Sequence, residues 1–133
     1  MSKLDASVQK LLQGKNFAFV STVNADGSPH VAPTWVDTDG DNVLVNTNVS
    51  TVKRRNMKRD PRVTLALTEQ TNPYNLVIIR GRVVEEISGP KATDQLDRLA
   101  KRYMGVEEFP DRKLASKQVT LRIKPERVFT RKA

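Results

Sequence analysis

Apolar and polar residues alternate along several short segments of this chain, and the alternation is typical of half-buried β-strands. The predicted strands cover residues 17–23, 31–37, 43–47, 62–68, 76–87 and 118–132. The turn sequences NADGSP (24–29) and TDGDN (38–42) join the first three, and each contains an Asp-Gly pair suited to positive φ. Because tight turns connect antiparallel neighbours, the pattern disfavours a parallel sheet. Gly81, inside the fifth strand, indicates a bend or close packing.

Three helices are expected between and beside these strands. Leu4, Val8 and Leu12 lie on one helical stripe that Gly14 can end. A short helix begins after Ser50 or Thr51 and stops before residues 60–61 (Asp-Pro), and a longer helix covers residues 89–105. Tyr103 falls on the apolar face of the longer helix, which predicts a core residue. The expected fold is mainly β (α+β): one domain over residues 1–133, built as a six-stranded antiparallel barrel whose ends or gaps the helices close.

The composition excludes several kinds of chemistry. The chain has no cysteine, so disulfides and Cys-based metal sites are impossible. His30 is the only histidine, and no metal site is expected. Since His30 follows a turn proline, we expect an exposed surface residue rather than a catalytic one. No apolar run approaches the roughly 18 residues that span a bilayer, and the N-terminus lacks the features of a signal peptide. We therefore expect a cytoplasmic protein that does not enter a membrane.

The charge is concentrated in one stretch. Residues 53–62 hold six cations and one acid, so they carry +5 of the chain's net +8. The cations are Lys53, Arg54, Arg55, Lys58, Arg59 and Arg62. Such a run fits a solvated face, a nucleic-acid patch or a site for a phosphorylated ligand. Aromatic residues make up 5% of the chain and do not interleave with the run, which disfavours a barrel that binds nucleic acid.

The position of this stretch favours a phosphate site. Thr47, Asn48, Ser50 and Thr51 lie where a predicted strand gives way to the short helix. The first turn of a helix has unpaired N–H groups and a positive dipole end, which suit a phosphate. Lys53 is close enough to the helix start to be a ligand, as is Arg55. Lys58, Arg59 and Arg62 lie beyond the first turn, where we expect them to be solvated or paired.

A second candidate region surrounds Pro33. A proline inside a predicted strand indicates an edge, a bulge or the rim of a site. Trp35, two residues later, would by itself suggest a core residue, and its proximity to Pro33 shifts the prediction toward a site rim.

Two blocks together resemble a known family. They are FVSTVNADGSPHVAPTWVD (19–37) and VNTNVSTVKRRNMKRDPRVTLAL (45–67). The pattern resembles the pyridoxamine-5′-phosphate-oxidase-like split β-barrel flavoproteins, and within them the small B-type flavin/deazaflavin oxidoreductases, many of which use coenzyme F-420. IRGRV (79–83), KRYMG (101–105) and IKPERV (123–128) resemble that branch as well. The likeness covers nearly the whole chain in one element order.

The resemblance implies an FMN-binding split-barrel fold and a homodimer with two cofactor sites at the subunit interface. It implies that Lys53 and Arg55 hold the cofactor phosphate, with Thr47, Asn48 and Ser50 nearby. The backbone of Pro33, Thr34 and Trp35 would run along the edge of the cofactor ring. Asn56 would hold the helix or touch the cofactor, and Tyr74, in the turn before the long strand, would reach the neighbouring subunit's site.

The implied function is an oxidoreductase in which reduced F-420 passes hydride to a conjugated small-molecule acceptor. The surplus of cations favours F-420, whose oligoglutamate tail is anionic, with FMN as the alternative cofactor. An FMN-dependent oxidoreductase and a flavin-storage protein stay open as alternatives, and a nucleic-acid-binding barrel is a remote one. The chain ends VFTRKA, without the Arg-x-His motif of pyridoxamine-phosphate oxidases, which argues against that substrate. The natural substrate and the catalytic residues are not identified.

Overall fold

The computed structural model describes residues 3–132, so residues 1, 2 and 133 of the predicted domain lie outside the described residues. Its strands are β1 (Ala18–Val23), β2 (Pro29–Thr34), β3 (Asp37–Thr38), β4 (Val43–Asn48), β5 (Arg62–Glu69), β6 (Asn72–Ile87) and β7 (Gln118–Arg131). Its helices are α1 (Ala6–Gln13), α2 (Val52–Arg59), α3 (Pro90–Met104) and α4 (Arg112–Ala115). Neighbouring strands pair antiparallel throughout, as predicted.

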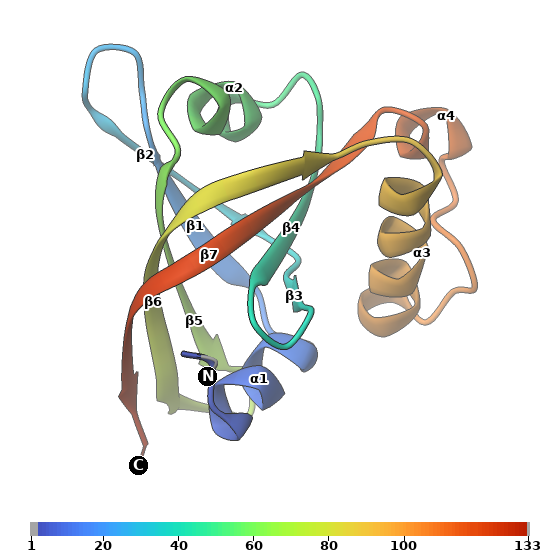
Figure 1. Ribbon diagram of the computed structural model, residues 1–133. Helices are drawn as coiled ribbons and strands as arrows, with labels where there is room; N and C mark the ends of the chain where they lie inside the picture. Colours follow the sequence, from blue (N-terminus) through green and yellow to red (C-terminus); the bar gives the residue numbers. More distant parts are fainter. Residues whose placement is uncertain (1–2, 133) are drawn as a thin grey trace.

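The strands form one sheet that curls into a barrel (Figure 1). Within residues 3–132 the sheet has seven strands in the order β2-β1-β5-β6-β7-β4-β3. Strands β2 and β3 lie at its two opposite edges, yet only Trp35 and Val36 separate them in the chain. The sheet must therefore bend back until two residues can bridge its edges. The predicted barrel class is confirmed.

Four details of the prediction are wrong. The sheet has a seventh strand, β3, because residues 37–38 pair with β4 after the bridge. Trp35 lies in that bridge and not in a strand, since β2 ends at Thr34. Residues 72–75 belong to β6, where a turn was expected, and α4 was not predicted.

The core fills the inside of the barrel. Inward pairs such as Val43–Ile123 and Val45–Leu121 are fully or almost fully buried. Leu4, Val8 and Leu12 close one end from α1 and its preceding residues, and Met57 of α2 closes the other; the two helices lie at opposite ends in Figure 1. Each such side chain contributes about 1.5–3 kcal/mol on burial. The prediction that helices close the barrel is confirmed.

Helix α3 covers the outer face of β4 and the first half of β7. This explains why five consecutive residues of β4, Val43 to Thr47, are buried: alternate side chains face the barrel interior and the helix. Tyr103 of α3 is buried, as predicted. The helix ends at Gly105, whose φ of 74° is the left-handed cap that glycine favours. Among residues 3–132, none of the helices is long and apolar enough to cross a membrane.

Candidate functional site

The loop from β4 to α2 is organised by its own polar side chains. The Asn48 side-chain oxygen accepts hydrogen bonds from the Ser50 backbone N–H, at 3.0 Å, and from the Ser50 hydroxyl, at 2.8 Å. The hydroxyls of Thr47 and Thr51 lie 3.0 Å apart. Arg55 reaches back and donates to the Ser50 carbonyl at 2.8 Å. The structure therefore brings four of the predicted phosphate-site residues, Thr47, Asn48, Ser50 and Arg55, together where β4 passes into α2.

Helix α2 begins as the sequence predicted. Thr51 is the N-cap, and its hydroxyl accepts from the Arg54 N–H at 3.3 Å. The backbone N–H groups of Val52 and Lys53 have no hydrogen-bond acceptor among residues 3–132. These two donors and the positive end of the helix dipole give the loop the character of an anion site.

Lys53 is the cation that matches this site best. Its side chain is half-buried, and in the described part of the chain it has no hydrogen bond or ion pair. Burial lowers the pKa of Lys53 below the ordinary lysine value, because the charged ammonium loses water without gaining a partner. A buried cation is normally paired, so this ammonium suits an anion from outside the chain.

Most other cations of the basic stretch are committed to the protein. Arg54 forms a two-point ion pair with Glu86, at 2.8 and 3.0 Å, and the hydrogen bond lowers the pKa of Glu86. Arg62 pairs with Asp60, and the Arg62 guanidinium lowers the pKa of that carboxyl to about 2. Arg59 donates to the Val23 carbonyl. The prediction that Arg59 and Arg62 are paired or solvated is confirmed.

Asn56 attaches α2 to the last residues of β1 and to the turn that follows. Its buried amide donates to the Thr22 hydroxyl at 3.0 Å and to the Asn24 side-chain oxygen at 2.9 Å. Arg59 donates to the Asn56 oxygen at 3.0 Å. Of the two roles expected for Asn56, this geometry shows it holding the helix.

Strand β2 lies beside α2 and is an edge of the sheet. One row of its backbone groups therefore has no neighbouring strand within the described chain. Pro33 and Thr34 are at the end of this edge, which suits the predicted contact between backbone and a flat ring. Pro33 has no N–H and cannot donate. The edge position expected from Pro33 is confirmed.

The Trp35 side chain belongs to an aromatic cluster. Its ring stacks on Tyr103 with 5.1 Å between centroids and 3° between planes, and Phe109 meets it edge-on at 6.2 Å. The Tyr103 hydroxyl donates to the Asn16 carbonyl at 2.6 Å, and burial raises the pKa of Tyr103. The cluster fixes the bridge between the barrel edges.

Two residues are placed differently from expectation. His30 is partly buried on β2, opposite Thr22, and its Nδ1 is buried with no partner in residues 3–132; the expected exposed histidine is wrong. Tyr74 lies in β6, not in a turn, and is 67% exposed. That part of β6 is near α1, whereas α2 caps the other end, so a single chain does not bring Tyr74 to the α2 loop.

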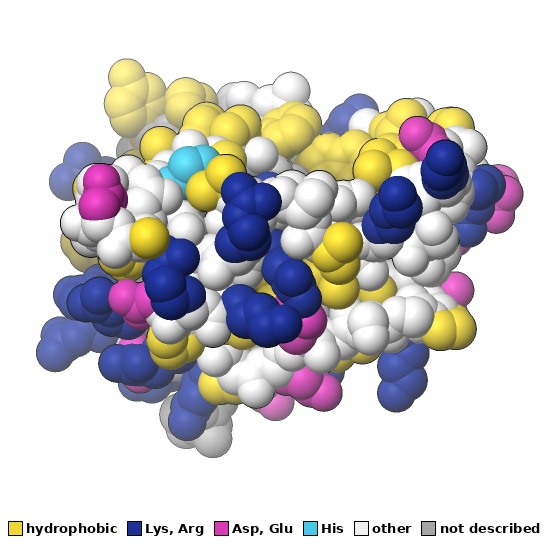
Figure 2. Space-filling view, turned by 90° about the horizontal axis from the view of Figure 1, so that it is seen from above, with side chains coloured by type: hydrophobic (Ala, Val, Ile, Leu, Met, Phe, Trp, Pro, Cys, Tyr) yellow, Lys and Arg dark blue, Asp and Glu magenta, His cyan; other side chains and the backbone are white. Residues whose placement is uncertain are grey.

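The face of the molecule that carries α2 has a basic area and an apolar area next to each other. Lys and Arg side chains gather over α2, and the histidine and a band of hydrophobic side chains border them (Figure 2). Sequence reasoning did not identify Asn24 or the stacking of Trp35 on Tyr103. The Asn56–Asn24 hydrogen bond and the Trp35–Tyr103 stack each join positions more than 30 residues apart, and no local sequence pattern indicates such pairs.

Comparison with known proteins agrees with this geometry. Residues 4–132 match the family described as Pyridoxamine 5'-phosphate oxidase. A solved structure named F420 Reductase is similar over 91% of this chain and 94% of its own, with 26% identity and a TM-score of 0.81. The conserved hypothetical protein Rv2991 from Mycobacterium tuberculosis has 23% identity and a TM-score of 0.76, over 98% of this chain and 84% of its own.

HutZ, the heme storage protein from Vibrio cholerae, shares the fold at 16% identity and a TM-score of 0.68, over 98% and 96% of the two chains. No curated protein sequence matches the chain. The family match covers nearly every residue, and the similar solved structures share the fold. This chain belongs to the pyridoxamine 5′-phosphate oxidase family of split β-barrel proteins.

Proposed function

We propose that this protein is an oxidoreductase that binds coenzyme F-420 and uses its reduced form to transfer hydride to a conjugated small molecule. The observation that carries the proposal is the half-buried, unpartnered Lys53 ammonium at the start of α2, beside an open edge strand. The likeness to a solved F420 reductase supports F-420 over FMN.

The residues present fit such a cofactor. Lys53, the N–H groups of Val52 and Lys53, and the unused guanidinium donors of Arg55 would hold the phosphate, which FMN shares with F-420. Thr47, Asn48 and Ser50 would shape that end of the site. The backbone of Pro33, Thr34 and Trp35 would border the ring. Each charge-assisted hydrogen bond, from Lys53 or from Arg55, contributes about 1.5–3 kcal/mol.

The protein's part in the reaction is binding, orientation and exclusion of water. A bound reduced deazaflavin supplies the hydride. Two carboxylates of the block 19–37 already bind other groups of the protein. Asp37 is buried and forms an ion pair with Arg102 at 2.9 Å, and Asp26 accepts a hydrogen bond from Ser28 in the β1–β2 turn. With these acids occupied, we propose that solvent provides any proton that the product needs.

We further propose that the protein acts as a homodimer. The outer face of β2, β1, β5, β6 and the end of β7 carries one continuous apolar row, from strand to strand: Pro33, Phe19, Ala66, Ile78 and Phe129. Phe19 and Phe129 are each 54% exposed in the single chain. A row that crosses five strands is more than the scattered apolar residues of a monomer surface, and a second copy is the partner we propose for it.

The test is a pair of titrations of the purified protein, one with F-420 and one with FMN, each followed by the fluorescence of the cofactor. The proposal expects saturable binding of F-420 that is tighter than that of FMN. Tighter binding of FMN would make the protein an FMN-dependent oxidoreductase instead. Saturable binding with no oxidation of reduced F-420 by any conjugated acceptor would favour cofactor storage.

A further inference from the structure

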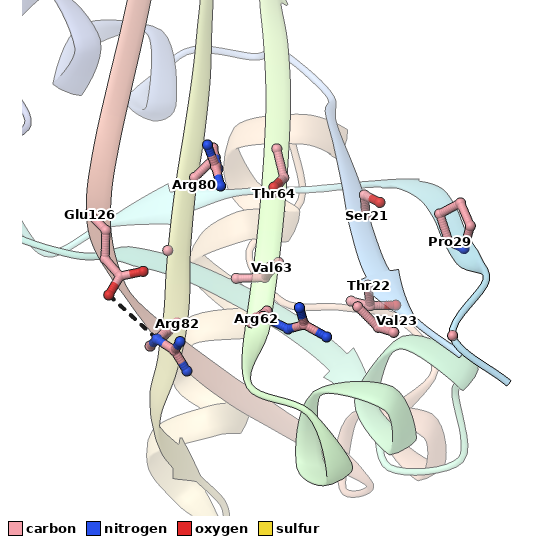
Figure 3. Close-up of a pocket in the computed structure, with 12 residues that line it drawn as sticks. Ser21, Thr22, Val23, Pro29, Arg62, Val63, Thr64, Arg80, Arg82 and Glu126 are labelled. Carbon is pink, nitrogen blue, oxygen red and sulfur yellow. Dashed lines mark ion pairs between the residues drawn. The ribbon is translucent and has the colours of Figure 1, made fainter. Parts of the chain in front are cut away.

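A hollow lies on the outer face of the sheet over β1, β5 and β6, with α2 beside it (Figure 3). Its volume is about 330 Å³. The polar residues that line it are Ser21, Thr22, Arg62, Thr64, Arg80, Arg82 and Glu126. None of the residues assigned above to the cofactor lines it. Three arginines and one glutamate line it, and neither the proposed oxidoreductase function nor the family match accounts for it.

Three side chains of the lining lie in one row across the sheet. Ser21 pairs with Thr64 across β1 and β5, and Thr64 pairs with Arg80 across β5 and β6. These two hydroxyls and this guanidinium make no hydrogen bond or ion pair with any residue between 3 and 132. Because directly paired side chains stand about 4.5–5.5 Å apart, the three groups form a row of donors across three strands. Figure 3 shows the Arg80 guanidinium beside Thr64 and the Ser21 hydroxyl further along the row.

The remaining charges leave the hollow positive. Arg62 is paired with Asp60, and Arg82 lies 3.4 Å from Glu126. Glu126 is the single acid of the lining, against three arginines. Arg127, which pairs with Arg80 across β6 and β7, adds another cation next to it. Only Arg80 among the three lining arginines has all five N–H donors available for a ligand.

A break in the sheet sets the position of these groups. The β6–β7 pairing shifts between Arg80, which faces Arg127, and Gly81, which faces Pro125, so Glu126 is an extra residue on β7. A side chain at position 81 could not be accommodated, because its Cβ would lie 2.3 Å from the Lys124 carbonyl oxygen. Bulges of this kind commonly redirect side chains next to binding sites.

We propose that this hollow binds the phosphate group of a small molecule, as a site separate from the cofactor loop. Arg80 would donate two parallel hydrogen bonds to the phosphate, and the Ser21 and Thr64 hydroxyls would donate to its remaining oxygens. The fork of a guanidinium matches a phosphate in this way, while hydroxyls fix its position. The proposal does not depend on which cofactor binds at α2.

The test uses the full chain and inorganic phosphate, with the backbone amide signals followed by NMR. We expect phosphate to shift the signals of Ser21, Thr64, Arg80 and Gly81 in a saturable manner. Arg80→Gln should weaken this binding about tenfold or more, and Thr64→Val, which keeps the shape of the side chain, should weaken it several-fold. Arg98→Gln is the matched control, since Arg98 is an exposed arginine on α3, and it should leave the affinity unchanged.

Lys53→Ala separates the two sites. It should abolish phosphate-dependent shifts at α2 and leave those of Ser21, Thr64 and Arg80 intact. The proposal is overturned if phosphate leaves these three signals unmoved, as it would if a second copy covers the hollow. It is equally overturned if Arg80→Gln, with a dispersed spectrum that shows a folded chain, binds phosphate as the unaltered protein does.

Discussion

The two halves of the sheet's outer face differ in what covers them. Over β4 and the first half of β7, α3 covers a set of polar side chains that bond to one another: Asn46 donates to the Ala92 carbonyl at 3.0 Å, Gln118 donates to Asn46 at 2.6 Å, and Thr120 donates to Gln95 at 2.6 Å. Over β1, β5, β6 and the end of β7, no element of residues 3–132 covers the row that contains Phe19, Ile78 and Phe129.

The contrast shows which half of the outer face the chain covers with its own residues. A polar outer face needs partners with exact hydrogen-bond geometry, and α3 supplies them from within the chain. An apolar outer face needs only another apolar surface, and residues 3–132 supply none. Strand β7 contributes to both halves, with polar side chains in its first part and Phe129 near its end. The difference between the halves therefore comes from the side chains and not from the course of the backbone.

The largest expected effect comes from placing a charge in the open half. Phe19→Asp would bury an unpaired carboxylate in the proposed dimer, which should weaken association by about 3–5 kcal/mol. Sedimentation velocity over a range of protein concentrations measures the change. Val84→Asp is the control, because Val84 is 55% exposed, almost the same as Phe19, but lies outside the apolar row. Equal behaviour of the two variants would show that the row is ordinary surface.

In the covered half the expected effect is on folding. Leu99 of α3 is fully buried, so Leu99→Ala should lower the free energy of unfolding by about 2–5 kcal/mol through lost burial and the cavity left behind. Met104→Ala, at an exposed position of the same helix, should cost under about 0.5 kcal/mol. Urea unfolding at one fixed protein concentration provides the comparison. A small effect of Leu99→Ala would mean that α3 is loosely attached and that both halves are open.

Two lysines of α2 differ in a similar way: Lys53 is half-buried without a partner in residues 3–132, and Lys58 is exposed to solvent. Lys53→Ala should weaken cofactor binding by about 1.5–3 kcal/mol, the range for a charge-assisted hydrogen bond. Lys58→Ala, which removes an exposed lysine from the same helix, should cost under about 0.5 kcal/mol. Fluorescence titrations of the two variants measure both values. Similar losses would indicate a diffuse basic surface and no specific phosphate site.

The smallest expected effect is a pH dependence in the cofactor-free protein. Burial lowers the pKa of Lys53, so between that lowered value and the ordinary 10.5 the unfolded chain holds a proton that the folded chain has released. The free energy of unfolding contributed by this group therefore rises with pH across that window. Lys53→Met should remove this contribution, as measured by urea unfolding at about pH 7 and about pH 10. An identical pH response of the two proteins would contradict a desolvated ammonium.

The strands and most helix ends could be predicted from the sequence because their causes are local. Thr51 caps α2, Asp60-Pro61 stops it, and the alternation of apolar residues marks the strands, all within a few positions. Strand β3 was missed because two residues carry no period. Its pairing with β4 depends on the closure of the barrel, which no short segment encodes.

The candidate site divides in the same way. The loop around Asn48 and Ser50 follows from residues adjacent in the chain. The Trp35–Tyr103 stack, the Asn56–Asn24 bond and the unpartnered state of Arg80 depend on which strands meet across the sheet. His30 was misjudged because its burial comes from its place on β2, opposite the buried Thr22, and not from the turn that precedes it.

Sedimentation velocity of the unaltered protein with F-420, recorded at the visible absorption of the cofactor, tests the account most directly. It reports in one experiment whether the cofactor is bound and how large the species that carries it is. The account predicts that the absorbance travels with a particle of about twice the 15.0 kDa chain mass. Absorbance that stays with free cofactor, or that travels with a single 15.0 kDa chain, would contradict it.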